Sequence, residues 1–155
     1  MADFDLASFK AALPSRGALI GIDPGTQTLG VASSDPDRRI AAPVRTITRS
    51  KLAADLAALA EIAQARGAIG FVIGHPLNMN GTKGPASQRA SALARQVSAA
   101  FGKPVLLWDE RLSSAEAERA MIAADLSRAK RAAAIDHAAA AIILQSALDR
   151  LNWAG

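Results

Sequence analysis

The spacing of apolar residues along this chain predicts five strands and four helices. Three strand-like runs come first, and each of the two later strands follows a helix. The predicted strands cover residues 18–24, 28–34, 38–48, 68–74 and 105–108. The predicted helices run from Ser50 to Gly67, over 86–101, from Ser113 or Ser114 to about Ala124, and over 132–151. The order β-β-β-α-β-α-β-α-α predicts an α/β fold in which a mixed five-stranded sheet carries helices on both faces.

Three local signals sharpen this prediction. Ser50 is a typical helix N-cap, and apolar residues follow it at helical spacing up to Gly67, a typical helix end. The run 68–74 is almost wholly apolar, which predicts a strand covered on both faces. Pro43 has no N–H to donate, so the third strand is expected to lie at a sheet edge or to begin irregularly.

The length of 155 residues fits one domain with a core of its own. Residues 1–16 are expected to form a lead-in, with a helical turn between Leu6 and Leu13 that Pro14 ends. Residues 17–151 are expected to form the domain itself.

Composition narrows the class of protein. Lysine and arginine exceed aspartate and glutamate by 18 to 14, which is compatible with a polyanionic partner such as nucleic acid. There are no cysteines, so disulfides and cysteine-ligated zinc are excluded. The first ten residues carry acids where a secretory signal needs basic residues, and the sequence has no run of roughly 18 apolar residues. We therefore expect a cytoplasmic protein with no membrane span.

The segment 18–35 holds the first candidate functional residue. Its apolar run 18–22 ends in a carboxylate, Asp23, and the turn Pro24-Gly25 follows at once. A charge at the end of a buried strand is costly unless it is compensated, and a hard cation such as Mg²⁺ is one natural compensator. The alternative is that Asp23 only caps the turn.

Three further acids are candidates. Asp109 and Glu110 end the fifth predicted strand, and Asp136 lies near the start of the last helix. If the first and fifth strands are parallel neighbours, these acids meet Asp23 beyond the carboxyl ends of the strands. Such a cluster could hold two divalent metals about 4 Å apart, an arrangement that hydrolyses phosphodiesters. The alternatives are a salt bridge to Arg111 and, for Asp136, a favourable charge at a helix N-terminus.

Two segments could contact phosphates. The loop 75–84 precedes a helix start and offers the donors Asn78, Asn80, Thr82 and Lys83. A polar surface loop is its alternative. The basic residues Arg128, Lys130 and Arg131 could contact a nucleic-acid backbone, or could belong to a solvated linker.

Together these motifs identify a family resemblance. The chain resembles the YqgF/RuvX family, the Holliday-junction-resolvase-like proteins also described as pre-16S rRNA nucleases. Four segments carry the resemblance, from about residue 17 to 150: GIDPGTQTLGVASSD, VIGHPLNMNGTKGPASQRA, DERLSSAEAERAM and DHAAAAIILQSALD. The chain departs from the usual loop GLPLNMDG, because His75 replaces a leucine and Asn80 an aspartate.

The resemblance implies an RNase H-like fold and a nuclease that depends on Mg²⁺ or Mn²⁺, with a two-metal site. Asp23, Glu110 and Asp136 match the family's catalytic and metal-binding acids, with Asp109 as the alternative to Glu110. Asn78, Lys83, Arg111 and Arg128 would position the nucleic acid. The implied role is maturation of the 5′ end of 16S rRNA, with pre-16S rRNA or branched DNA, and ribosomal precursor particles, as partners of a monomer or homodimer.

Three rival functions remain. One is a nucleic-acid-binding ribosome-assembly factor that does not hydrolyse its ligand. Another is a resolvase that acts on four-way DNA junctions, for which a stable dimer is expected. The third follows from the pattern Asp-x-Gly-Thr at 23–26, which resembles the phosphate-binding hairpin of actin-like ATPases. Those enzymes need two such domains, and this chain is long enough for one.

Overall fold

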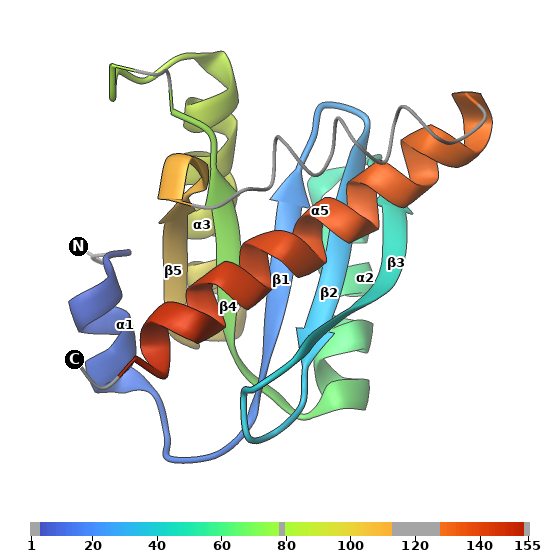
Figure 1. The fold of residues 1–155 in the computed structure, drawn as a ribbon. Helices are drawn as coiled ribbons and strands as arrows, with labels where there is room; N and C mark the ends of the chain where they lie inside the picture. The colour runs from blue at the N-terminus through green and yellow to red at the C-terminus, as the bar shows by residue number, and fades with distance from the viewer. Residues whose placement is uncertain (1–3, 78–79, 113–127, 154–155) are drawn as a thin grey trace.

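In the computed structural model, the structure describes residues 4–77, 80–112 and 128–153, with only the backbone course for 112 and 128–137. Figure 1 shows one twisted sheet between two layers of helices. The strands are β1 (Ala18–Pro24), β2 (Thr28–Ser34), β3 (Ala41–Thr48), β4 (Ala68–His75) and β5 (Val105–Asp109). The helices are α1 (Leu6–Ala12), α2 (Leu52–Arg66), α3 (Pro85–Phe101), the 3₁₀ turn η1 (Glu110–Leu112) and α5 (Arg128–Leu151). The predicted mixed five-stranded sheet with helices on both faces is confirmed.

The order of strands in the sheet is β3-β2-β1-β4-β5. β2 is antiparallel to both β1 and β3, whereas β4 is parallel to β1 and to β5. The carboxyl ends of β1, β4 and β5 therefore share one edge of the sheet, which we call the carboxyl edge. Pro43 lies in β3, an outer strand, as the sequence predicted, and the nearly all-apolar β4 lies in the interior of the sheet.

Side chains alternate along the strands and divide the core into two clusters. Ile20, Ile22 and Ile73 pack with residues of α2 and α3 on one face. Leu19 and Val72 pack with residues of α1 and α5 on the other, which we call the α5 face. In Figure 1, α5 crosses that face diagonally, with α2 and α3 behind the sheet. A slip of one residue in β1 would exchange the two apolar sets, so the packing fixes the face on which Asp23 lies.

Helix α1 forms where the sequence predicted a helical turn. The Asp5 carboxylate accepts a hydrogen bond of 2.7 Å from the Ser8 N–H at its N-terminus, and the helix ends before Pro14. Phe9 is 2% exposed and packs in the cluster on the α5 face.

Three predicted boundaries are wrong. β3 begins at Ala41 instead of residue 38, because Arg38 adopts a left-handed turn conformation with φ 57°. Lys51, not Ser50, is the N-cap of α2, and the Ser50 N–H instead donates to the Asp55 carboxylate. α5 begins at Arg128 instead of residue 132, so 128–131 form the start of this helix and do not form a linker. The helix predicted between 113 and 124 lies outside the described residues.

The turn before β3 supplies a testable pH dependence. The Asp35 carboxylate accepts hydrogen bonds of 2.9 Å from the N–H groups of Arg39 and Ile40, and these bonds, that of Ile40 first, lower the pKa of Asp35 below 3.8. A lowered folded-state pKa gives stability that is fully present above the unfolded value and disappears as the pH falls through the folded value. We expect Asp35→Asn to lower Tm at about pH 7, and the difference from the parent to shrink as the pH falls below 3.8, measured by circular dichroism. A Tm difference that stays constant over this range would contradict the assignment.

Candidate acidic site at the carboxyl edge

Asp23 lies near the end of β1, beside the turn into β2. It pairs with Gly30 of β2 and is partly buried. Alternation along β1 places Asp23 on the same side as Leu19 and Gly21, the α5 face. The strand therefore presents this carboxylate to the α5 face at the carboxyl edge.

Glu110, which directly follows β5, approaches Asp23 from the other side of β4. The pairing of Ile22 with Ile73 brings Gly74, one residue further, alongside Asp23. A Cβ placed on Gly74 would lie 3.4 Å from both Cδ and Oε2 of Glu110, and 2.7 Å from Cδ1 of Ile143 in α5. The Glu110 carboxylate therefore lies over Gly74 on the α5 face, at the level of Asp23, and Glu110 is only 8% exposed.

This arrangement corrects one sequence prediction. β1 and β5 are not neighbours, because β4 lies between them. The acids still approach because Glu110 follows β5 in the η1 turn and its carboxylate reaches β4 at a residue without a side chain. A Cβ on Gly74 would be in van der Waals contact with that carboxylate.

Asp109 belongs to the other face. It follows Leu107 by two residues, and Leu107 packs against the α2–α3 cluster. Its carboxylate accepts hydrogen bonds from the Arg111 side chain at 2.7 to 3.1 Å, and these bonds lower the pKa of Asp109. Asp109 thus forms the salt bridge that the sequence offered as an alternative, and Glu110 is the acid on the side of Asp23.

Asp136 lies in α5, one helical turn before Ala140. The Ala140 carbonyl oxygen would be 3.0 Å from a Cβ on Gly21, so α5 crosses β1 two residues before Asp23. The Asp136 side chain is outside the described part of the chain. Among the side chains that are described, no three histidines or acids converge as metal ligands.

Two of the residues predicted to contact nucleic acid, Lys83 and Arg111, lie near the same edge of the sheet. Lys83 is exposed in the loop between β4 and α3, and Arg111 lies with Nη1 3.3 Å from the position of a Cβ on Gly81 in that loop. Within this loop, the backbone N–H and the hydroxyl group of Thr82 both donate hydrogen bonds to the side-chain oxygen of Asn80. The structure therefore brings Arg111 to the loop that carries Lys83, whereas Asn78 and the Arg128 side chain lie outside the described residues.

Sequence reasoning missed Arg49. Its Nη1 donates 2.8 Å to the Gly25 carbonyl in the turn after Asp23, and its Nε lies 3.7 Å from the carboxylate of Asp55, which is 3% exposed. Arg49 therefore ties the β1–β2 turn to α2. The sequence signal that could have indicated this contact is Asp55, a carboxylate on the same helix face as the apolar Leu59 and Ile62. A carboxylate on a buried face needs a cationic partner.

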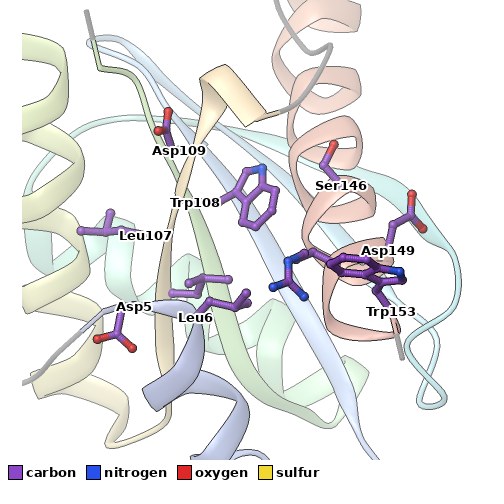
Figure 2. Close-up of a pocket in the computed structure, with 10 residues that line it drawn as sticks. Asp5, Leu6, Leu107, Trp108, Asp109, Ser146, Asp149 and Trp153 are labelled. Carbon is purple, nitrogen blue, oxygen red and sulfur yellow. The ribbon is translucent and has the colours of Figure 1, made fainter. Parts of the chain in front are cut away.

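A cavity of about 640 Å³ lies between α1, β5 and the end of α5, as Figure 2 shows. In that view Leu107 and Trp108 leave β5 on opposite sides, toward α3 and α5. Its lining is mainly apolar and includes neither Asp23 nor Glu110 among the described residues, so the acidic site is separate from it.

Comparison with solved structures identifies the fold. Thermus thermophilus RuvC, solved with a Holliday junction substrate, superimposes with a TM-score of 0.53 at 15% identity, over 87% of this chain and 96% of RuvC. A second Thermus thermophilus RuvC structure gives a TM-score of 0.51. The fold is therefore RNase H-like, as the family resemblance implied.

Sequence comparison specifies the family. Residues 17–150 match the family model described as "RuvX: Holliday junction resolvase", so the chain belongs to the RuvX family. A relative from Cereibacter sphaeroides is 53% identical over 97% of this chain and 94% of its own length. One from Rhodopseudomonas palustris is 56% identical over 89% and 86%. Both bear the name "Putative pre-16S rRNA nuclease".

Proposed function

We propose that this protein is a metal-dependent endonuclease that hydrolyses phosphodiester bonds. The observation that carries the proposal is that the Glu110 carboxylate lies over Gly74, the residue alongside Asp23. Both acids therefore lie on the α5 face of the sheet, at its carboxyl edge. Two acids brought together in a partly buried place repel each other unless a cation lies between them. Membership of the RuvX family supports the same conclusion.

The donor set fits Mg²⁺ or Mn²⁺. Carboxylate oxygens are the ligands that hard divalent cations prefer, and Asp23 and Glu110 supply them from a strand end and from a turn anchored on β5. Asp136 completes the proposed set from α5. When bound, a pair of such ions activates the attacking water and stabilises the charge on the leaving oxygen.

Other residues of the chain hold the catalytic acids in position and supply positive charge for the nucleic acid. Arg49 holds the turn after Asp23 through the Gly25 carbonyl, which limits the movement of the carboxylate. Lys83 and Arg111 supply positive charge to the phosphodiester backbone at the same edge, and Asn78 and Arg128 are proposed to extend that contact. Positioned charge of this kind accounts for much of the rate enhancement in phosphoryl-transfer enzymes.

We infer that the substrate is precursor 16S rRNA, cleaved to mature its 5′ end in the cytoplasm, in ribosomal precursor particles. The names of the relatives at 53% and 56% identity support RNA. The second candidate is a four-way DNA junction, which the description of the family model and the ligand of the RuvC structure favour. The part of the chain that the structure describes contains no helix long and apolar enough to cross a membrane.

A side-by-side cleavage assay tests the proposal. Purified protein with Mg²⁺ or Mn²⁺ receives a 16S precursor 5′-leader RNA and a four-way DNA junction, with a chelator-treated reaction as the control. We expect cleavage of the RNA that stops when the metal is removed. Cleavage of the junction alone would assign the protein to the resolvases, a role for which a homodimer rather than a monomer is expected. Binding of the RNA without cleavage of either substrate would indicate a non-catalytic assembly factor.

A further inference from the structure

A second cavity, of about 510 Å³, lies on the side of the sheet opposite α5. Helix α3 forms one wall with Ser91, Arg95 and Ser98, and Lys83 lies at the loop end. The remaining lining is apolar and consists of Phe4, Ala99 and Leu107. We call this space the α3 cavity.

The polar wall of the α3 cavity is organised by the helix. Residues 91, 95 and 98 follow one another at i, i+4 and i+7, so they form a single stripe along α3. Arg95 and Lys83 are exposed and supply two positive charges, and no acid is among the residues that line the cavity within the described part of the chain. Two cations with two hydroxyl groups make a site for an anion with several oxygen atoms, such as a phosphate group.

The apolar wall of the cavity offers a surface for an uncharged part of a ligand, in addition to a phosphate group. Phe4 and Leu107 lie opposite the stripe, and the Phe4 carbonyl accepts a hydrogen bond of 2.9 Å from the Leu107 N–H, which fixes this segment to the outer side of β5. An apolar surface facing a cationic stripe suits a nucleotide, whose phosphate is charged and whose base has an apolar face. The volume is that of a small-ligand pocket, which suits one nucleotide of a single strand but not a duplex.

The α3 cavity and the acidic site flank the same end of β4 from opposite faces of the sheet. Ser91 Oγ lies 3.4 Å from Nε2 of His75, the residue that follows Gly74 and pairs with Asp109 across β4 and β5. Arg95 is four residues beyond Ser91, about 6 Å further along α3. Lys83 belongs to the cavity and to the loop against which Arg111 lies. Positive charge therefore continues from the carboxyl edge into the cavity.

We propose that the α3 cavity binds a nucleotide flanking the scissile bond, with Arg95 as its phosphate ligand, so that a single strand bends over the carboxyl edge from the α5 face to the α3 side. This inference rests on the proposed nuclease function and adds a binding residue to it. It selects a substrate that is single-stranded beside the cleavage position, because a duplex is too wide and too stiff to follow this path.

Equilibrium binding by the full chain tests the inference. The Asp23→Asn variant removes cleavage from the measurement, and fluorescence anisotropy follows a labelled single-stranded RNA. Adding Arg95→Ala is expected to weaken binding roughly 5- to 20-fold and to reduce the salt dependence of log Kd by about 0.7, the value for one lost phosphate contact on a single strand. Arg95→Lys keeps the charge and is expected to recover most of the affinity.

The matched control is Arg66→Ala. Arg66 is also exposed on a helix, but it ends α2 just before β4 begins, at the opposite edge of the sheet. Its removal is expected to change Kd less than about twofold, the effect of general charge loss. Equal effects of Arg95→Ala and Arg66→Ala would overturn the proposal, as would an equal loss of affinity for a fully double-stranded RNA.

The result separates this inference from the proposed function. If the parent protein cleaves RNA and Arg95→Ala binds it as the control does, the cavity has no such role and the nuclease proposal stands. If Arg95→Ala binds more weakly while the parent cleaves nothing, the cavity is supported and the nuclease proposal fails. Binding of inorganic phosphate by the parent, with no difference between the variants on RNA, would indicate a free-anion site and contradict the proposal.

Discussion

Asp23→Asn and Glu110→Gln are each expected to lower the rate of RNA cleavage by at least about 10²-fold, because each removes a charge aimed at the reacting phosphate while keeping nearly the same shape. Both carboxylates belong to the acidic site at the carboxyl edge, because Glu110 lies over Gly74 and Gly74 lies beside Asp23. Single-turnover kinetics with saturating Mg²⁺ measure the loss, and the melting temperature verifies that the variants are folded.

The control for this prediction is the neighbouring acid. Asp109→Asn changes the charge by the same amount one residue away, but its carboxylate pairs with Arg111 on the other face. We expect a loss of no more than about tenfold, through a less firmly held Arg111, because exposed ion pairs are weak. Equal losses in Asp109→Asn and Glu110→Gln would show that the site has been assigned to the wrong acid.

Gly21→Ala is expected to destabilise the fold by about 2–3 kcal/mol, the upper part of the range for overpacked cores. The new Cβ would lie 2.7 Å from Cβ of Leu144 and 3.0 Å from the carbonyl oxygen of Ala140. Both atoms belong to the rigid part of α5, and both residues are fully buried, so only a shift of the helix relieves the contact. Urea unfolding measures the change in the free energy of unfolding.

Gly74→Ala is the matched comparison on the same face. Its Cβ also meets an atom at 2.7 Å, but that atom is Cδ1 of Ile143, the end of a side chain that can rotate. The expected loss of stability is therefore smaller, less than about 1.5 kcal/mol, and the new methyl group makes only an ordinary van der Waals contact, at 3.4 Å, with the Glu110 carboxylate. If Gly21→Ala unfolded at the same urea concentration as the parent, the close packing of α5 on β1 would be wrong.

Much of the fold could be predicted because its signals are local. The apolar runs around Asp23, the all-apolar β4 and the glycine ends of α2 and α3 each specify their element without reference to the rest of the chain. The predicted start of β3 failed because it depends on tertiary contacts. Arg38 donates to the carbonyls of Pro14 and Gly17, far away in the sequence, and this holds it in the turn before β3.

The site could be predicted only in part. The pattern around Asp23 and the acids after β5 predicted that these acids meet beyond the strand ends, and the structure places Asp23 and Glu110 at the carboxyl edge, but the sequence could not decide between Asp109 and Glu110. The faces on which these two acids lie depend on where β5 ends and on the η1 turn. Arg49 and the α3 cavity were not predicted, because each is formed by residues from separate elements that meet only in the folded chain.

Mn²⁺ binding tests the central claim most directly, since it requires no knowledge of the substrate. Electron paramagnetic resonance of free Mn²⁺ during a titration counts the ions that the protein takes up. We expect the parent and Asp109→Asn to bind Mn²⁺, and Asp23→Asn and Glu110→Gln to bind it at least about tenfold more weakly, the loss expected when a metal ligand or its support is removed. Equal Mn²⁺ affinity in all four proteins would contradict the metal site at the carboxyl edge.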